Sequence, residues 1–138
     1  MKKFAKELRI GNLVFRTNKQ TKEKLLIELT ASDILDISAN GVLSSFIYEP
    51  IPLTTEEWLL KFGFIKDEYQ AKECGEDVGD LFKFKNFYIC KKENQFFHYI
   101  EIDSDNFYSF CYTLIINIHD LQNLYFARIR EELILKNS

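Results

Sequence analysis

The stretch TTEEWLLKFGF, residues 54–64, predicts a short helix with a defined beginning and end. Thr54 stands where an N-terminal cap belongs, and Glu57 follows at the spacing of a capping box, so that its side chain can reach back to the cap. Gly63 follows the last helical residue, where the left-handed backbone conformation favours glycine. Trp58 lies on the apolar side of this helix, so we expect its ring to be largely buried.

A second helical pattern, HDLQNLYFA at residues 119–127, lies beyond a region that is aromatic at nearly every second residue. Within this region, residues 81–91, 96–103 and 107–116 are separated by short polar connections of the length that antiparallel hairpins use. The alternation predicts a three-stranded antiparallel meander whose apolar face is covered by the two helices. We place Leu114 on an apolar face that needs such a cover.

The first part of the chain has the pattern of a small β structure. Residues 8–49 read as short strands joined by polar turns. Ser32 and Asp33 precede a short apolar group and resemble the cap of a single helical turn. Pro50 and Pro52 then stop strand pairing and fix an extended connector, so we expect a boundary between subdomains after residue 52.

Together these patterns predict an α+β fold. We expect a small SH3-like, barrel-like β region over residues 1–52, followed over residues 53–138 by a helix, the three-stranded meander and a C-terminal helix. The two parts are expected to form one compact unit, because 138 residues is a common size for a single domain with its own core. The pattern leaves open whether residues 128–138 continue the helix or form a strand.

Charge and cysteine content favour an ordinary cytoplasmic protein. The 18 basic and 21 acidic residues give a net charge of −3, which provides no overall attraction to nucleic acid or anionic lipid. Charges follow the basic start of the chain before any apolar run develops, and no run is long enough to span a bilayer, so we expect neither export nor membrane insertion. The three cysteines form no close pair, which fits a reducing compartment.

The chain contains two histidines, His98 and His119, and each is a candidate acid, base or ligand. No phosphate-binding loop, nucleophile elbow or metalloprotease helix accompanies them, so we predict no catalytic, cofactor-binding or metal site and no cofactor. His119, in the first turn of a helix, is the candidate functional histidine. The alternative is a small hydrolase or nuclease that pairs His98 or His119 with Asp103 or Asp120. A pocket holding His119 with two carboxylates in hydrogen-bond reach would favour that alternative.

Four lysines interleave with aromatic residues on the first strand of the predicted meander: Lys83, Lys85, Lys91 and Lys92. A basic strand with exposed aromatic rings is one way to hold a single-stranded nucleic acid. The same alternation also fits an edge strand whose lysines prevent aggregation. Binding of nucleic acid through these lysines is therefore one of two interpretations of the pattern.

Four longer motifs occur along the chain: LRIGN at 8–12, EPIPLT at 49–54, EEWLLKFGF at 56–64 and LQNLYFA at 121–127. In these motifs and their order the chain resembles a family of small uncharacterised proteins from prophages and mobile elements of anaerobic gut-type bacteria. That family has no established activity, so the resemblance implies no catalytic residue. Its members tend to carry Leu-Thr-Gly where this chain has Arg-Ile-Arg at 128–130, without the glycine that would end the helix.

The lack of a reactive motif, beside many aromatic residues suited to packing, predicts a protein that is not an enzyme. We expect a non-enzymatic interaction module of a phage or mobile element. Its expected partner is another protein or a second copy of the same chain, with nucleic acid as a weaker option and no role for a membrane.

Overall fold

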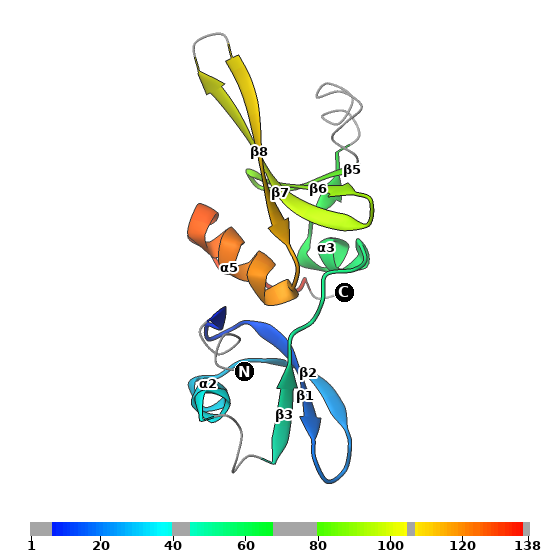
Figure 1. Ribbon diagram of the computed structural model, residues 1–138, viewed down its shortest axis with the longest axis vertical. Helices are drawn as coiled ribbons and strands as arrows, with labels where there is room; N and C mark the ends of the chain where they lie inside the picture. The colour runs from blue at the N-terminus through cyan, green and yellow to red at the C-terminus, as the bar shows by residue number, and fades with distance from the viewer. Residues whose placement is uncertain (1–6, 40–44, 68–79, 105–106, 137–138) are drawn as a thin grey trace. The chain divides into compact units, whose positions relative to one another are not determined.

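The computed structural model contains helices and antiparallel sheets together, so the predicted α+β class is confirmed. It describes residues 7–39, 45–67, 80–104 and 107–136, with the backbone alone for residues 99–104 and 107–112. The chain divides into two compact units: unit 1 is formed by residues 1–52 and 117–124, and unit 2 by residues 53–116 and 125–138. Figure 1 labels the helices and strands of both units.

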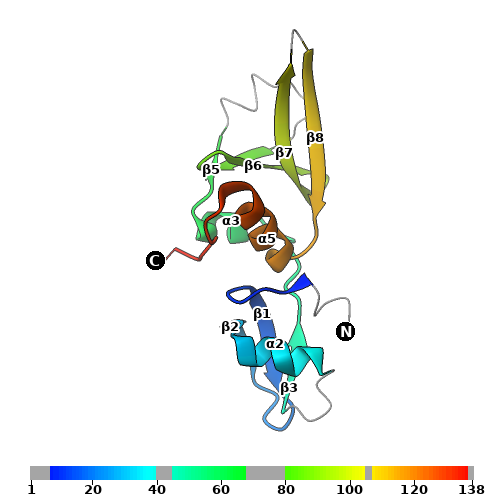
Figure 2. The ribbon, with the colours of Figure 1, turned by 90° about the vertical axis from the view of Figure 1, so that its left-hand side faces the viewer.

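A three-stranded antiparallel sheet with the strand order β2-β1-β3 is the centre of unit 1. Its strands are β1 (Leu13–Asn18), β2 (Lys24–Glu28) and β3 (Phe46–Glu49). The helix α2 (Ala31–Ser38) lies against one face of this sheet, as Figure 2 shows. The described strands do not close into a barrel, and the SH3-like character of this region stays a prediction.

The start of α2 is fixed by a capping box between Thr30 and Asp33. The Asp33 N–H donates to Oγ1 of Thr30 at 3.3 Å, and the Thr30 N–H donates to Oδ2 of Asp33 at 3.0 Å. Burial acts to raise the pKa of Asp33, but hydrogen bonds from Thr30 and Tyr48 outweigh it, so this pKa is lowered. The predicted cap at Ser32 is wrong. The cap is Thr30, which stands three residues before Asp33, the spacing that a capping box requires.

The two faces of the unit 1 sheet differ in what covers them. Val14, on the face toward α2, packs in a core with Ile37 and Tyr48. Strand alternation turns the neighbouring residues to the opposite face, where Phe15 lies directly across from Leu26. On that second face Leu13 is buried, whereas Leu26 is 42% exposed and Ile47, which lies across from Thr17, is 45% exposed.

Unit 2 contains a five-stranded antiparallel sheet with the order β4-β5-β6-β7-β8. Its strands are β4 (Ile65–Lys66), β5 (Asp80–Phe84), β6 (Phe87–Lys92), β7 (Gln95–Ser104) and β8 (Phe107–Ile115). The predicted three-stranded meander is therefore wrong in its strand count. Residues 81–91 form a hairpin rather than one strand, and β4 adds a further short strand at the edge.

The missed hairpin turns at Lys85, whose φ is 54°, between Phe84 and Phe87. A two-residue hairpin loop needs positive φ, which glycine and asparagine adopt more easily than lysine. The loop contains no glycine, and the positive φ falls on Lys85 rather than on Asn86, its second residue, so the usual sequence signal of the turn is missing at the position that needs it. The next loop follows the expected pattern, because Glu93 and Asn94 both have positive φ between paired strands.

The first helix of unit 2, α3, spans Glu57–Phe62. It begins after Glu56, which makes no capping hydrogen bond through its side chain, so the predicted cap at Thr54 is wrong. The predicted end is confirmed: Gly63 has φ 102°, and the Phe64 N–H donates to the Leu59 carbonyl at 2.9 Å. The Trp58 side chain on α3 is half-buried, less than we expected from the sequence.

Aromatic rings form the core of unit 2 around Phe87. The centroid of its ring lies 4.1 Å from that of His98, 5.2 Å from that of Tyr125 and 6.2 Å from that of Phe64. Leu114 does not share this covered face. It pairs with Phe97 on the opposite face and is 45% exposed, more than expected for a residue on a covered face.

The last helix, α5 (Ile118–Ile129), ends without a glycine. Arg130 takes the left-handed conformation with φ 68°, and its N–H donates to the Phe126 carbonyl at 2.8 Å. Residues 131–136 neither continue the helix nor form a strand; Leu133 is buried, and the Lys136 N–H donates to the Lys61 carbonyl at 2.7 Å. No helix in the described part of the chain has the length and apolar run that crossing a membrane requires.

Replacement of Arg130 by glycine should stabilise the protein. The left-handed conformation destabilises a residue with a Cβ by about 1–2 kcal/mol, and glycine avoids most of this cost. We therefore expect the free energy of unfolding to increase by about 0.5–1 kcal/mol. Urea denaturation measures the change. The control Arg128→Gly, inside the helix, should lose about 1 kcal/mol. Equal losses in both variants would contradict the assigned end of α5.

Candidate functional site

Hydrogen bonds to its cap and to the proline connector hold the first turn of α5. The Asn117 N–H donates to Oδ2 of Asp120 at 3.0 Å, so Asp120 satisfies a donor at the start of the helix. The Ile118 N–H donates to the Ile51 carbonyl at 2.7 Å. Both contacts lie within unit 1, and they position the neighbouring side chain of His119.

Gln122, one turn further along α5, is a buried amide that bonds to the backbone before and within β1. Its Oε1 accepts a hydrogen bond from the Leu13 N–H at 2.7 Å, and its Nε2 donates to the Gly11 carbonyl at 3.3 Å. Burying an amide is unfavourable unless its polar atoms find partners. A side chain without these polar atoms would leave the Leu13 N–H and the Gly11 carbonyl without this partner, so the fold favours an amide at position 122.

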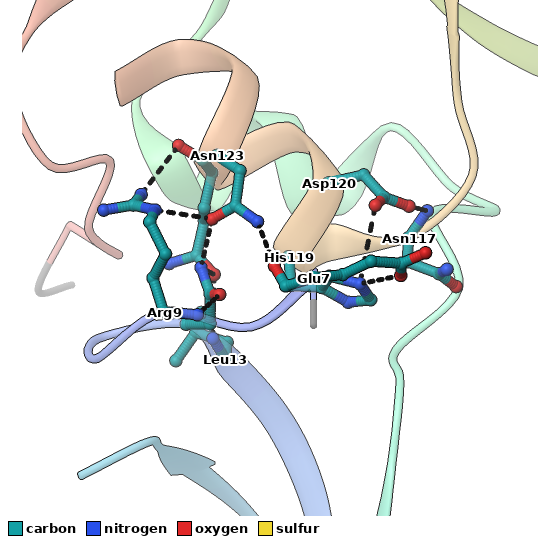
Figure 3. Close-up of polar contacts among 9 residues, drawn as sticks. Glu7, Arg9, Leu13, Asn117, His119, Asp120 and Asn123 are labelled. Atoms are coloured by element: carbon teal, nitrogen blue, oxygen red, sulfur yellow. Dashed lines mark hydrogen bonds and ion pairs between the residues drawn. The ribbon is translucent and has the colours of Figure 1, made fainter. Parts of the chain in front are cut away.

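Asn123 extends the same network toward the first described residues (Figure 3). Its Nδ2 donates to the Glu7 carbonyl at 2.6 Å, and its Oδ1 accepts from Arg9 Nε at 2.8 Å and from Asn12 Nδ2 at 2.9 Å. Asn12 is fully buried, and its own Oδ1 accepts from the Arg9 N–H at 2.6 Å. The network fixes the backbone of residues 7–13 beside the first half of α5.

His119 lies between two carboxylates as a consequence of this arrangement (Figure 3). Its Nε2 is 3.1 Å from Oε2 of Glu7 and 3.4 Å from Oδ1 of Asp120. One ligand atom from each of the three residues lies within 4.8 Å of the other two. The His119 side chain is 0% exposed, while those of Glu7 and Asp120 are 37% and 34% exposed.

The chemistry of this cluster follows from the nitrogen at its centre. A protonated Nε2 donates toward the two oxygen atoms, and a deprotonated Nε2 presents a lone pair beside two negative charges. A cation among the three atoms would offset the negative charge of the two carboxylates. Proton and metal ion are thus alternative occupants of the same position, and both fit the residues present.

The geometry around His119 was only partly visible in the sequence. Asp120 was one of the two acids considered for it, whereas Glu7 was missed because 112 residues separate it from His119. Gln122 and Asn123 were also missed as site residues. The available signal was a pair of amides within the otherwise apolar string LQNL, which points to a buried polar contact.

The other histidine has a structural environment. Nδ1 of His98 lies 3.0 Å from the Tyr88 carbonyl oxygen, and its ring stacks on Phe87. Burial lowers the pKa of His98, and the nearby charge of Arg128 acts in the same direction, while the Tyr88 carbonyl opposes them. The side chain of Asp103, the acid considered as its partner, lies outside the described residues.

The four lysines of the nucleic-acid hypothesis do not share one face. Register places Lys83 and Lys92 on one side of the β5–β6 hairpin and Lys91 on the other. Nζ of Lys91 is 3.9 Å from Oε2 of Glu56, and Lys85, in the hairpin loop, pairs with Glu131. Lys83 lies over the Tyr88 ring at 5.6 Å, which is a cation–π contact.

Cys90 is a buried free thiol in the unit 2 sheet. Burial raises the pKa of Cys90 to about 11, so the thiol is protonated and unreactive at neutral pH. Cys74 and the side chain of Cys111 lie outside the described residues. The described thiol therefore adds no reactive group to the site.

Replacing Gln122 with leucine should destabilise unit 1. The change keeps the size of the side chain but leaves the Leu13 N–H and the Gly11 carbonyl without their amide partner. We expect a loss of about 2–4 kcal/mol, from about 1–3 kcal/mol for each unsatisfied buried group. Denaturant unfolding measures it, with the exposed Gln95→Leu change as the control, expected within about 0.5 kcal/mol of the parent. A similarly small effect at Gln122 would contradict the network.

Comparison of the chain with protein-family models, with curated proteins and with solved structures finds no match in any of the three. The site is therefore interpreted from its own geometry and chemistry.

Proposed function

We propose that this protein is a non-enzymatic interaction module that binds an extended segment of a protein partner along the β2 edge of unit 1. The observation that carries this proposal is an apolar stripe of Phe15, Leu26 and Ile47 on the sheet face opposite α2. Leu26 is 42% exposed and Ile47 is 45% exposed. A contiguous exposed apolar surface on a folded domain is typical of a binding site.

The register places these three side chains next to one another. Phe15 lies directly across from Leu26 on β2, and Thr17, two residues along β1, lies across from Ile47 on β3. A stripe of this kind crosses all three strands. Lys24, on the same face, lies with its Nζ 4.5 Å from the centre of the Phe15 ring and gives the stripe a charged rim.

The backbone of β2 favours an extended partner over a globular one. Within the described residues β2 pairs only with β1, so its other edge is open. The Asn18 N–H bonds to the Glu23 carbonyl, and strand alternation therefore turns the N–H groups of residues 24, 26 and 28 to the open edge. An added strand would pair there and place its apolar side chains beside Leu26.

The lysine positions support a protein partner more than a nucleic acid. A single-strand groove needs a row of cations along one track, whereas Lys85 and Lys91 already pair with acidic residues and Lys91 lies on a different face from Lys83. Nucleic-acid binding through these residues is the weaker version of the proposal.

A second candidate is a small hydrolase or nuclease that acts through His119 and Asp120. It is favoured by the two carboxylates within 3.1 Å and 3.4 Å of the His119 ring nitrogen. Full burial of the ring argues against it, because a general base must reach the proton that it removes. Equal cleavage of DNA, RNA and ester substrates by the parent and by His119→Ala would eliminate this candidate.

The wider setting of the module is part of the same proposal. The resemblance to prophage and mobile-element proteins supports a role in such an element. The free Cys90 thiol is consistent with a location in the reducing cytoplasm. An SH3-like arrangement of unit 1 would suit a peptide-binding module, and self-association through the β2 edge would make a second copy of the chain the partner.

Selection from a displayed library of random peptides tests the proposal. We expect peptides with alternating apolar residues, whose binding is lost in Leu26→Asp because a charge then interrupts the stripe. The control Leu114→Asp changes an equally accessible leucine in unit 2 and should retain binding. Failure to select any peptide, or equal binding by both variants, would contradict the proposal. A concentration-dependent dimer that Leu26→Asp abolishes would identify the partner as a second copy.

A further inference from the structure

We propose that Glu7, His119 and Asp120 form a binding site for a divalent transition-metal ion such as Zn²⁺. Oε2 of Glu7, Nε2 of His119 and Oδ1 of Asp120 would be its ligands. The site lies at the start of α5, contains no residue of β2, and does not depend on the proposed interaction surface.

The separations between these atoms match those between ligands that share one metal ion. Bonds of about 2.0–2.2 Å place two ligands about 3.3–3.6 Å apart at a tetrahedral angle and about 2.8–3.1 Å apart at a right angle. The observed distances from Nε2 of His119 are 3.1 Å to Glu7 and 3.4 Å to Asp120. All three atoms lie within 4.8 Å of one another, so small side-chain rotations can close the third separation.

Contacts behind the ligands hold them in place. The second oxygen of Asp120 accepts from the Asn117 N–H at 3.0 Å, which leaves Oδ1 directed toward His119. The Glu7 backbone is fixed by Asn123, whose Nδ2 donates to the Glu7 carbonyl at 2.6 Å. Such outer contacts orient the ligands of metal sites and reduce the entropy that binding would cost.

Charge favours a dication at this position. Two carboxylates and a neutral imidazole carry a formal charge of about −2, which a divalent ion neutralises. The start of a helix opposes a cation with a partial charge of about +0.5, and this is smaller than the charge of the two acids. The half-exposed carboxylates leave one side open for water as a further ligand.

The donor set selects the class of metal. Imidazole nitrogen suits Zn²⁺ and its first-row neighbours, whereas Mg²⁺ and Ca²⁺ prefer oxygen ligands alone. Carboxylates bind Mn²⁺ as well as Zn²⁺, so both ions are useful probes. Binding should weaken as the solution becomes acidic, because protons compete for the ring nitrogen and the carboxylates.

Nuclear magnetic resonance of the imidazole nitrogens tests the site directly. The chain has two histidines, so the spectrum is simple and His98, in the aromatic core of unit 2, serves as an internal control. We expect Zn²⁺ to shift the His119 ring resonances and leave those of His98 in place. Mn²⁺ should broaden the His119 signals more strongly than those of His98, and Mg²⁺ at the same concentration should change neither ring.

Calorimetric titration with Zn²⁺ measures the affinity of the parent protein and of matched variants. Glu7→Gln removes one charged ligand from a half-exposed position and should weaken binding by about 10- to 100-fold or more. The control Glu23→Gln, an exposed acid in the loop between β1 and β2, should bind as the parent does. His119→Gln should abolish the histidine-dependent binding, and circular dichroism checks that each variant is folded.

Two results would overturn the site. One is an unchanged His119 spectrum at Zn²⁺ concentrations that saturate ordinary three-ligand sites. The other is Zn²⁺ affinity that is equal in the parent, Glu7→Gln and His119→Gln proteins, since binding would then lie elsewhere, for example at a thiol. Peptide binding at the β2 edge is measured without metal, so its outcome is independent of these results.

Discussion

The burial of the Gln122 amide, with the half-buried amide of Asn123 beside it, is the constraint on which unit 1 depends. An amide in the interior must form its hydrogen bonds or cost several kcal/mol. Gln122 meets this need through Leu13, 109 residues away, and Asn123 through the carbonyl of Glu7, 116 residues away. The start of α5 therefore completes a unit whose sheet comes entirely from the first part of the chain.

The candidate site follows from the same constraint. Asn123 fixes the Glu7 backbone, and the cap contact of Asn117 fixes Asp120, so two acids from distant segments converge on the buried ring of His119. A loss of the amide contacts would release Glu7 and leave Asp120 as the sole acid of the cluster at His119. The proposed metal site thus depends on the packing of unit 1, whereas the apolar stripe on the sheet requires only the strand register.

Local rules explain which parts of the fold were predictable. Gly63 could be assigned as the end of α3 because its conformation is decided by its own backbone and the preceding turn. The cap at Thr54 and the single strand over residues 81–91 failed, since a plausible cap pattern need not be used and Lys85 adopts a turn conformation that its residue type does not favour. The alternation of apolar residues still identified sheets and helices, and hence the α+β class.

The candidate site was less predictable, because no local rule pairs Glu7 with His119. Periodicity indicates which face of an element is buried but not which distant segment packs against it. The amides of LQNL indicated a buried polar contact without naming its partner. Nor could the exposed stripe be foreseen, because Phe15, Leu26 and Ile47 come together only once the register of three strands is known.

Hydrogen exchange of the Leu13 amide tests the central role of Gln122 most directly. This N–H lies before the part of β1 that pairs with β3, and the bond of the Leu29 N–H to the Asn12 carbonyl places it on the side of β1 away from β2. Its partner is the Gln122 side chain, so we predict protection comparable to that of the neighbouring β1 amides and its selective loss in Gln122→Leu. Rapid exchange of the Leu13 amide in the parent protein would contradict the account.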